Sequence, residues 1–133
     1  MKLDSAFARQ ILLTMENYPD YLISSLRLKD KLDIKTKELE RKFMGHILLL
    51  ADANLVDYFP ENKWPFGFVY GVDGEYSIIE VGYRLTAVAY DLLDVCRNDE
   101  VFEKIKHLSI NNALEISKQI IAKKTLGDRR SKS

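Results

Sequence analysis

The chain has 133 residues, no net charge at neutral pH and a single cysteine, Cys96. This length predicts one domain with its own core, and a lone cysteine excludes an internal disulfide and fits a reducing compartment. No apolar run approaches the roughly 18 residues of a membrane span, and Asp4 and Arg9 interrupt the start where a signal peptide would be apolar, so we expect a cytoplasmic protein.

The first predicted element is a helix over residues 4–18. Phe7, Ile11 and Met15 recur at the spacing of one helical face. Pro19 cannot continue a helix and is expected to end this one.

The segment that follows is ambiguous. Leu26 and Leu28 alternate as in a strand, whereas Leu28 and Leu32 are spaced as in a short helix. We expect an extended segment over residues 24–34. The alternative is the second helix of a helix-turn-helix, with its turn at residues 33–35.

Residues 36–59 predict an amphipathic helix that leads directly into a strand. Thr36 is a suitable N-cap, and Asn54 is suited to the left-handed position that closes a helix. The apolar sector of this helix is expected to contain four residues: Leu39, Phe43, Ile47 and Leu50.

A β-hairpin is predicted next, with strands over residues 66–72 and 75–85 around the turn Asp73–Gly74. Three helices are expected to follow, capped by Thr86, by Asn98 or Asp99, and by Ser109. The last should run from residue 110 to about residue 125 and stop at Gly127.

This order predicts an α+β fold, namely a winged-helix-like domain. It consists of an N-terminal helix, a central helix followed by a β-hairpin wing, and two to three C-terminal helices. The domain is expected to cover residues 1–127, and residues 128–133 should form a disordered basic tail.

Four segments, in order, carry a family resemblance: MKLD…ILL, HILLLADANLV, RLT…LLDVCRNDEVFEKIK and SINNALEISKQIIAKKTLG. They resemble a divergent member of an uncharacterised bacterial and phage family, domain-of-unknown-function family 2513. His46 occupies the family's histidine position, whereas Asn54 replaces its glycine and Phe102 its usual tryptophan. The resemblance implies a winged-helix-like shape and a phage or mobile-element context, and it implies no activity.

Double-stranded DNA is the first predicted partner, because the segment from Arg27 to Lys42 carries more basic than acidic residues. The acidic hairpin tip, with Asp73 and Glu75, argues against DNA because it would repel phosphates. The phosphate contacts expected for a DNA-binding regulator are Lys35, Lys37, Arg41, Lys42, Arg129 and Arg130.

A protein partner is the alternative, for an adaptor or inhibitor that does not bind DNA. Its predicted surface combines an exposed strip of the central helix with the acidic hairpin, in the residues Met44, Gly45, Leu48, Asp73 and Glu75. A homodimer that pairs through the last helix is also possible. The face expected to pair is an apolar stripe of this helix, formed by Ile110, Leu114, Ser117 and Ile121. The same stripe could equally complete the core of the monomer.

Catalysis and metal binding are not expected. His46 lies in the apolar sector of the central helix, where a hydrogen-bonded core histidine is the favoured interpretation. His107 and Cys96 are not at metal-ligand spacing from it. No phosphate-binding loop or nucleophile motif occurs, so we predict no enzyme, no cofactor and no metal.

Overall fold

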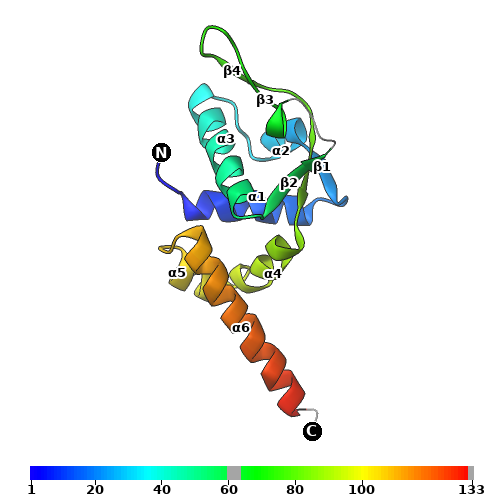
Figure 1. Cartoon of the computed structure of the whole chain (residues 1–133), viewed down its shortest axis with the longest axis vertical. Coiled ribbons are helices and arrows are strands. Elements are labelled where there is room, and N and C mark those ends of the chain that lie inside the picture. Colours follow the sequence, from blue (N-terminus) through cyan, green and yellow to red (C-terminus); the bar gives the residue numbers. More distant parts are fainter. Residues whose placement is uncertain (60–63, 132–133) are drawn as a thin grey trace.

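The computed structural model describes residues 1–59 and 64–131, with the backbone alone described for residue 121 and residues 124–131. Helices and two small antiparallel sheets form an α+β fold (Figure 1). The elements are α1 (Ser5–Asn17), β1 (Leu22–Ser24), α2 (Ser25–Lys31), α3 (Lys37–Asp52), β2 (Val56–Phe59), the 3₁₀ turn η1 (Pro65–Gly67), β3 (Phe68–Tyr70), β4 (Tyr76–Ile78), β5 (Gly82–Leu85), α4 (Ala87–Cys96), α5 (Asp99–Ile105) and α6 (Ile110–Ser131).

The larger sheet has the strand order β1–β5–β2, with both neighbours antiparallel to β5. Its central residue, Tyr83, lies opposite Ile23 of β1 and Tyr58 of β2 and is completely buried. The Tyr83 hydroxyl donates a hydrogen bond of 2.5 Å to the carbonyl of Phe66, and burial raises the pKa of this phenol. Tyr83 therefore links β5, the central strand of this sheet, to η1 at the start of the hairpin.

The predicted hairpin is present around Asp73–Gly74, but its second strand is broken. β4 pairs with β3 in a separate two-stranded sheet, whereas β5 belongs to the larger sheet. The break follows from Ser25, whose hydroxyl donates to the carbonyl of Ile79 at 2.8 Å and accepts from the amide of Val81 at 3.1 Å. These two bonds fix the connection between the sheets against the start of α2.

The expectation of an extended segment over residues 24–34 is wrong for most of its length, because residues 25–31 form α2. Ser24 caps this helix by accepting from the amide of Arg27, and Leu28 is fully buried. Asp33 then takes a left-handed conformation with φ 57°, as in a tight turn. The backbone over residues 25–31 therefore follows the helical alternative.

The caps predicted for α3 are confirmed: Thr36 accepts from the amide of Leu39, and Asn54 has φ 62°. Its buried face differs from the prediction. Met44 is buried with 5% exposure, whereas Leu39 is 39% exposed. The expected exposed strip from Met44 to Leu48 is therefore wrong at Met44, because the inward face of α3 is wide enough to take both Phe43 and Met44.

The C-terminal helices begin at the predicted caps Thr86, Asn98 and Ser109. Thr86 also donates a hydrogen bond of 2.6 Å to the carbonyl of Asn54, which joins the end of α3 to the start of α4. α6 does not stop at Gly127 but continues to Ser131, so residues 128–131 are helical where we expected a tail. Residues 132–133 lie outside the described part of the chain.

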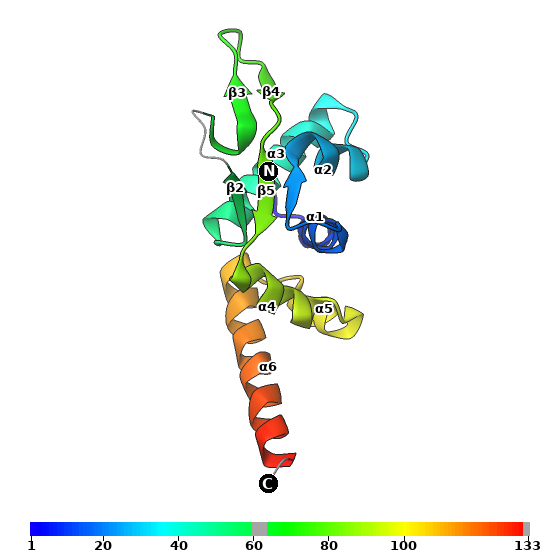
Figure 2. The same ribbon diagram turned by 90° about the vertical axis from the view of Figure 1, so that its right-hand side faces the viewer.

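α6 packs on α4 through its first turns and then projects away from the rest of the molecule (Figures 1 and 2). Ile110 and Leu114 pack against the core, and Ser117 is buried. These three residues of the predicted dimer stripe therefore pack within the monomer. The side chain of the fourth, Ile121, lies outside the described atoms. Over the described residues, no helix combines the length and apolarity that crossing a membrane requires.

Candidate functional site

A groove of about 430 Å³ lies between the outward side of α3 and the hairpin β3–β4, and we call it the α3–hairpin groove. One face of the hairpin is buried at its base and exposed nearer the turn. Phe68 and Ile78 pack against the core at its base, and the next pair on the same face, Tyr70 and Tyr76, is exposed. The groove is lined by Arg41, Met44, Gly45, Leu48, Tyr70, Gly74 and Tyr76.

One ring contact lies within the hairpin, and two further contacts join the hairpin to α3. The rings of Tyr70 and Tyr76 meet edge to face with 4.7 Å between centroids, and the guanidinium of Arg41 lies 5.8 Å above the Tyr76 ring. Lys37 Nζ lies 3.0 Å from a carboxylate oxygen of Glu75. Since both partners of this ion pair are largely exposed, we expect it to position the hairpin with only a small gain in stability.

The structure does not gather the predicted phosphate contacts into one basic face. Lys35 pairs with Asp33 at 3.1 Å, and Lys42 pairs with Asp4 at 2.7 Å. Arg129 and Arg130 follow at the far end of α6, at the opposite end of the molecule from α3 (Figure 1). Of the predicted phosphate contacts whose side chains are described, Arg41 lines the α3–hairpin groove. Lys37 lies with Arg41 and Tyr76 in a small hollow beside the groove, which we call its mouth.

The predicted protein-binding residues lie in or beside the groove, and Met44 differs from the prediction only in being buried. Leu48 is exposed in the groove, and Glu75 lies at its mouth. Gly45 accommodates the side chain of Met1, because a Cβ at this position would stand 2.7 Å from the Met1 sulfur. Asp73 caps the hairpin turn by accepting from the amide of Glu75.

His46 is a hydrogen-bonded core residue, as the sequence indicated. It is fully buried, its Nε2 accepts from the amide of Asp4 at 2.9 Å, and its Nδ1 lies 2.8 Å from the carbonyl of Lys42. Because an amide can only donate, Nε2 must be unprotonated, and Nδ1–H donates to the carbonyl. His46 thereby joins the start of α1 to the middle of α3.

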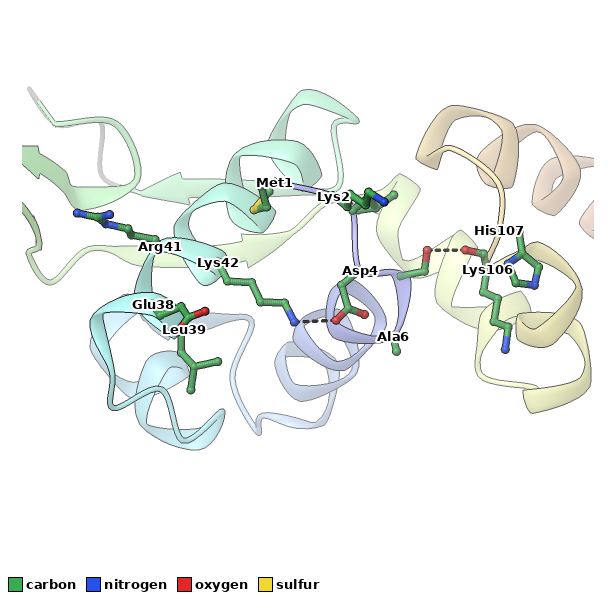
Figure 3. Close-up of a pocket in the computed structure, with 12 residues that line it drawn as sticks. Met1, Lys2, Asp4, Ala6, Glu38, Leu39, Arg41, Lys42, Lys106 and His107 are labelled. Atoms are coloured by element: carbon green, nitrogen blue, oxygen red, sulfur yellow. Dashed lines mark hydrogen bonds and ion pairs between the residues drawn. The ribbon is translucent and has the colours of Figure 1, made fainter.

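Asp4 completes this junction. It caps α1 by accepting a hydrogen bond from the amide of Phe7. Its carboxylate also forms an ion pair with the ammonium of Lys42 (Figure 3). This ammonium lies 4.9 Å from the centre of the Phe7 ring. The hydrogen bonds from Lys42 and from the Phe7 amide lower the pKa of the Asp4 carboxyl. Lys42 is therefore engaged in the fold.

Replacing Asp4 by asparagine is expected to keep the cap and lose the charge, at a cost of about 0.5–1 kcal/mol at neutral pH, a modest value because the pair is partly exposed. Since the folded-state pKa of Asp4 lies below its usual value, this contribution is full above pH 4 and disappears as the pH falls below it. Urea unfolding of both proteins between pH 7 and pH 2 measures the difference. A constant difference would contradict the assignment.

A wider hollow opens on the other side of α3, toward α5, with a volume of about 1000 Å³ (Figure 3). Its walls mix charges of both signs, from Lys2, Asp4, Glu38 and Lys106. Lys106 is paired with Glu103, and its carbonyl accepts from Ser5 at 2.6 Å. Asp4 and Lys106 of this surface are thus both held in ion pairs within the fold.

The described residues include no group of three histidine, cysteine or acidic side chains that would hold a metal ion. Cys96 is buried, and this burial raises the pKa of its thiol, which disfavours the reactive thiolate. The sequence from Trp64 to Tyr70 is rich in aromatic residues, on which the bases of a single-stranded nucleic acid could stack. Phe66 and Phe68 of this segment are buried and therefore not available for such stacking.

Sequence reasoning missed Tyr70 and Tyr76 as site residues. Both stand close to the turn, on opposite strands, but a two-residue turn at Asp73–Gly74 would place Ser77 opposite Tyr70. The turn of the structure has three residues, 72–74, and this register pairs Tyr70 with Tyr76. Comparisons with protein-family models, with curated proteins and with solved structures gave no match. The site must therefore be interpreted from its own geometry, and the family resemblance stays a prediction.

Proposed function

We propose that this chain is a non-enzymatic binding protein with a winged-helix arrangement, and that its α3–hairpin groove binds a protein. The succession α1–β1–α2–α3–β2, then a hairpin, then a strand placed between β1 and β2 supports the winged-helix assignment. One observation carries the class of partner. Leu48, Tyr70 and Tyr76 are exposed together in a groove, and such apolar patches mark protein-binding surfaces.

Double-stranded DNA is the second candidate, favoured by the same topology and by the exposure of Lys35, Lys37 and Arg41 beside α3. Two observations disfavour it. Lys37 already faces Glu75, and the hairpin, which would approach the phosphates, carries Glu75 and Glu80 without a basic residue between Phe68 and Val81.

The two candidates differ in their response to salt. We expect no salt-sensitive binding to a labelled mixed-sequence duplex in an anisotropy titration at low and moderate ionic strength. The paired variant Lys37→Glu with Arg41→Glu should behave like the natural protein, as should the charge-matched control Arg27→Glu with Lys31→Glu on α2. Affinity that falls steeply with salt and is lost only in the first variant would establish DNA as the partner and refute a protein-binding groove.

Site-specific photo-crosslinking tests the protein partner directly. A photoreactive phenylalanine analogue replaces Leu48 in one sample and Leu26, an equally exposed leucine of α2, in the other. In cells of the organism that encodes the chain, we expect a discrete protein adduct from position 48 and none from position 26. Adducts of the same pattern from both positions would show that the groove is not a binding site.

A further inference from the structure

The α3–hairpin groove contains a single charge. Of the residues that line it, only Arg41 is ionised, and the others are Met44, Leu48, two tyrosines and two glycines. A partner that is complementary to this groove therefore carries one negatively charged group with apolar surface around it.

The guanidinium of Arg41 is available for such a group. It forms no ion pair with any described residue, although acidic side chains are near in sequence. Glu40 is held by Lys29 at 2.6 Å, and Glu75 is held by Lys37. The acids that border the mouth of the groove therefore already have partners.

The same guanidinium lies on the hairpin side of the groove. Its Cζ is 5.8 Å from the centre of the Tyr76 ring, a distance at which the cation and the ring face attract each other. The planar guanidinium of an arginine can bind a carboxylate through two parallel hydrogen bonds, which a lysine cannot do. Leu48 and Tyr70 lie in the same groove and offer apolar surface to the flanking residues.

The groove suits a peptide carboxylate better than a nucleic-acid phosphate. A phosphate chain would carry several negative charges past Asp73, Glu75 and Glu80 of the hairpin. A protein segment with one acidic residue between apolar residues meets Arg41 without that repulsion. Its apolar side chains would also cover Leu48 and the exposed edge of the tyrosine pair.

We propose that the α3–hairpin groove recognises a short protein segment in which one aspartate or glutamate stands between large apolar residues, with Arg41 binding the carboxylate. This inference rests on the proposed function and names the chemistry of the partner. Leu48, Tyr70 and Tyr76 contact the apolar residues.

Two pools of fluorescein-labelled synthetic peptides test this assignment. The first has Leu-Asp-Phe or Phe-Glu-Leu at its centre between flexible Gly-Ser arms, and the second has Asn or Gln in place of the acid. We expect the natural protein to bind the acidic pool about tenfold more tightly, which corresponds to the roughly 1.4 kcal/mol of one charge-assisted contact. Amide NMR signals that shift on binding should belong to α3 and the hairpin.

Arg41→Gln should abolish this preference and bind both pools equally, whereas Arg27→Gln, a matched change of another arginine without an ion pair among the described residues, should keep it. Leu48→Asp should bind neither pool, and circular dichroism checks that each variant is folded. Equal affinity for the two pools, or a preference that survives Arg41→Gln, would refute the inference. Stronger binding of a duplex than of either pool would do the same.

Failure of this inference is distinguishable from failure of the proposed function. If the groove binds a partner of other chemistry, the crosslink at position 48 persists while both peptide pools fail to bind. If the groove binds no protein, the crosslink is also absent. The two experiments together therefore separate the wrong partner from the wrong site.

Discussion

Replacing His46 by leucine is expected to destabilise the protein by about 3 kcal/mol. The leucine fills most of the space but makes neither hydrogen bond of the imidazole, so the amide of Asp4 loses its partner, whereas the carbonyl of Lys42 keeps only the hydrogen bond of the α3 backbone. A buried polar group without a partner costs roughly 1–3 kcal/mol, and the lost bond from Nδ1–H to Lys42 adds to this cost. The start of α1 should loosen first, because His46 is its link to α3.

His46→Gln is the matched control. Its side-chain carbonyl can still accept from the amide of Asp4, so about half of the loss should be recovered. Urea denaturation of the three proteins measures both values, and hydrogen exchange of the α1 amides locates the change. Equal stability of the leucine variant and the natural protein would mean that His46 does not connect α1 to α3.

Changing Gly67 to alanine should be similarly costly, at about 3 kcal/mol, and should also disturb the groove. Gly67 has φ 76°, and an added Cβ would stand 2.5 Å from the carbonyl oxygen of Ile79. That oxygen cannot retreat easily, since it accepts the hydroxyl of Ser25. Backbone strain alone contributes roughly 1–3 kcal/mol, and relief of the clash must separate residue 67 from Ile79, which face each other across the base of the hairpin.

Gly74→Ala separates strain from displacement. Gly74 also has a positive φ, of 80°, but a Cβ there meets no atom within 4 Å. We expect a loss of about 1 kcal/mol and an undisplaced hairpin base for Gly74→Ala, against a larger loss and a displaced hairpin base for Gly67→Ala. Thermal unfolding measures the two losses, and the amide NMR shifts of residues 66–70 and 76–81 report the displacement. Equal effects of the two changes would show that the contact with Ile79 does not position the hairpin.

Those features of the fold that depend on neighbouring residues were predictable from the sequence. The caps Thr36 and Thr86, the left-handed Asn54 and the Asp73–Gly74 turn each follow from local chemistry. The helix over residues 25–31 and the break between β4 and β5 were not. The spacing of Leu26, Leu28 and Leu32 fits a strand as well as a helix, and in the structure Leu28 is buried on the helix. The break between β4 and β5 depends on Ser25, which bonds to residues more than fifty positions later, and no local pattern reveals such a partner.

The candidate site shows the same division. Arg41, Gly45 and Leu48 were found from the helical spacing of α3, which is local. The engagement of Lys42 by Asp4 and of Lys37 by Glu75 was not, because each pair spans 38 positions in the chain. A basic segment in a sequence therefore overstates the positive charge that a folded surface makes available to phosphate.

The position of β5 has a consequence for how the chain is made. Among the described residues, β1 and β2 each have β5 as their one strand partner, and β5 ends at Leu85. Until a ribosome has synthesised β5, both outer strands lack the backbone hydrogen bonds of the finished sheet. The helices up to α3 can form early, but the sheet that fixes their packing can close only after β5 has emerged from the exit tunnel.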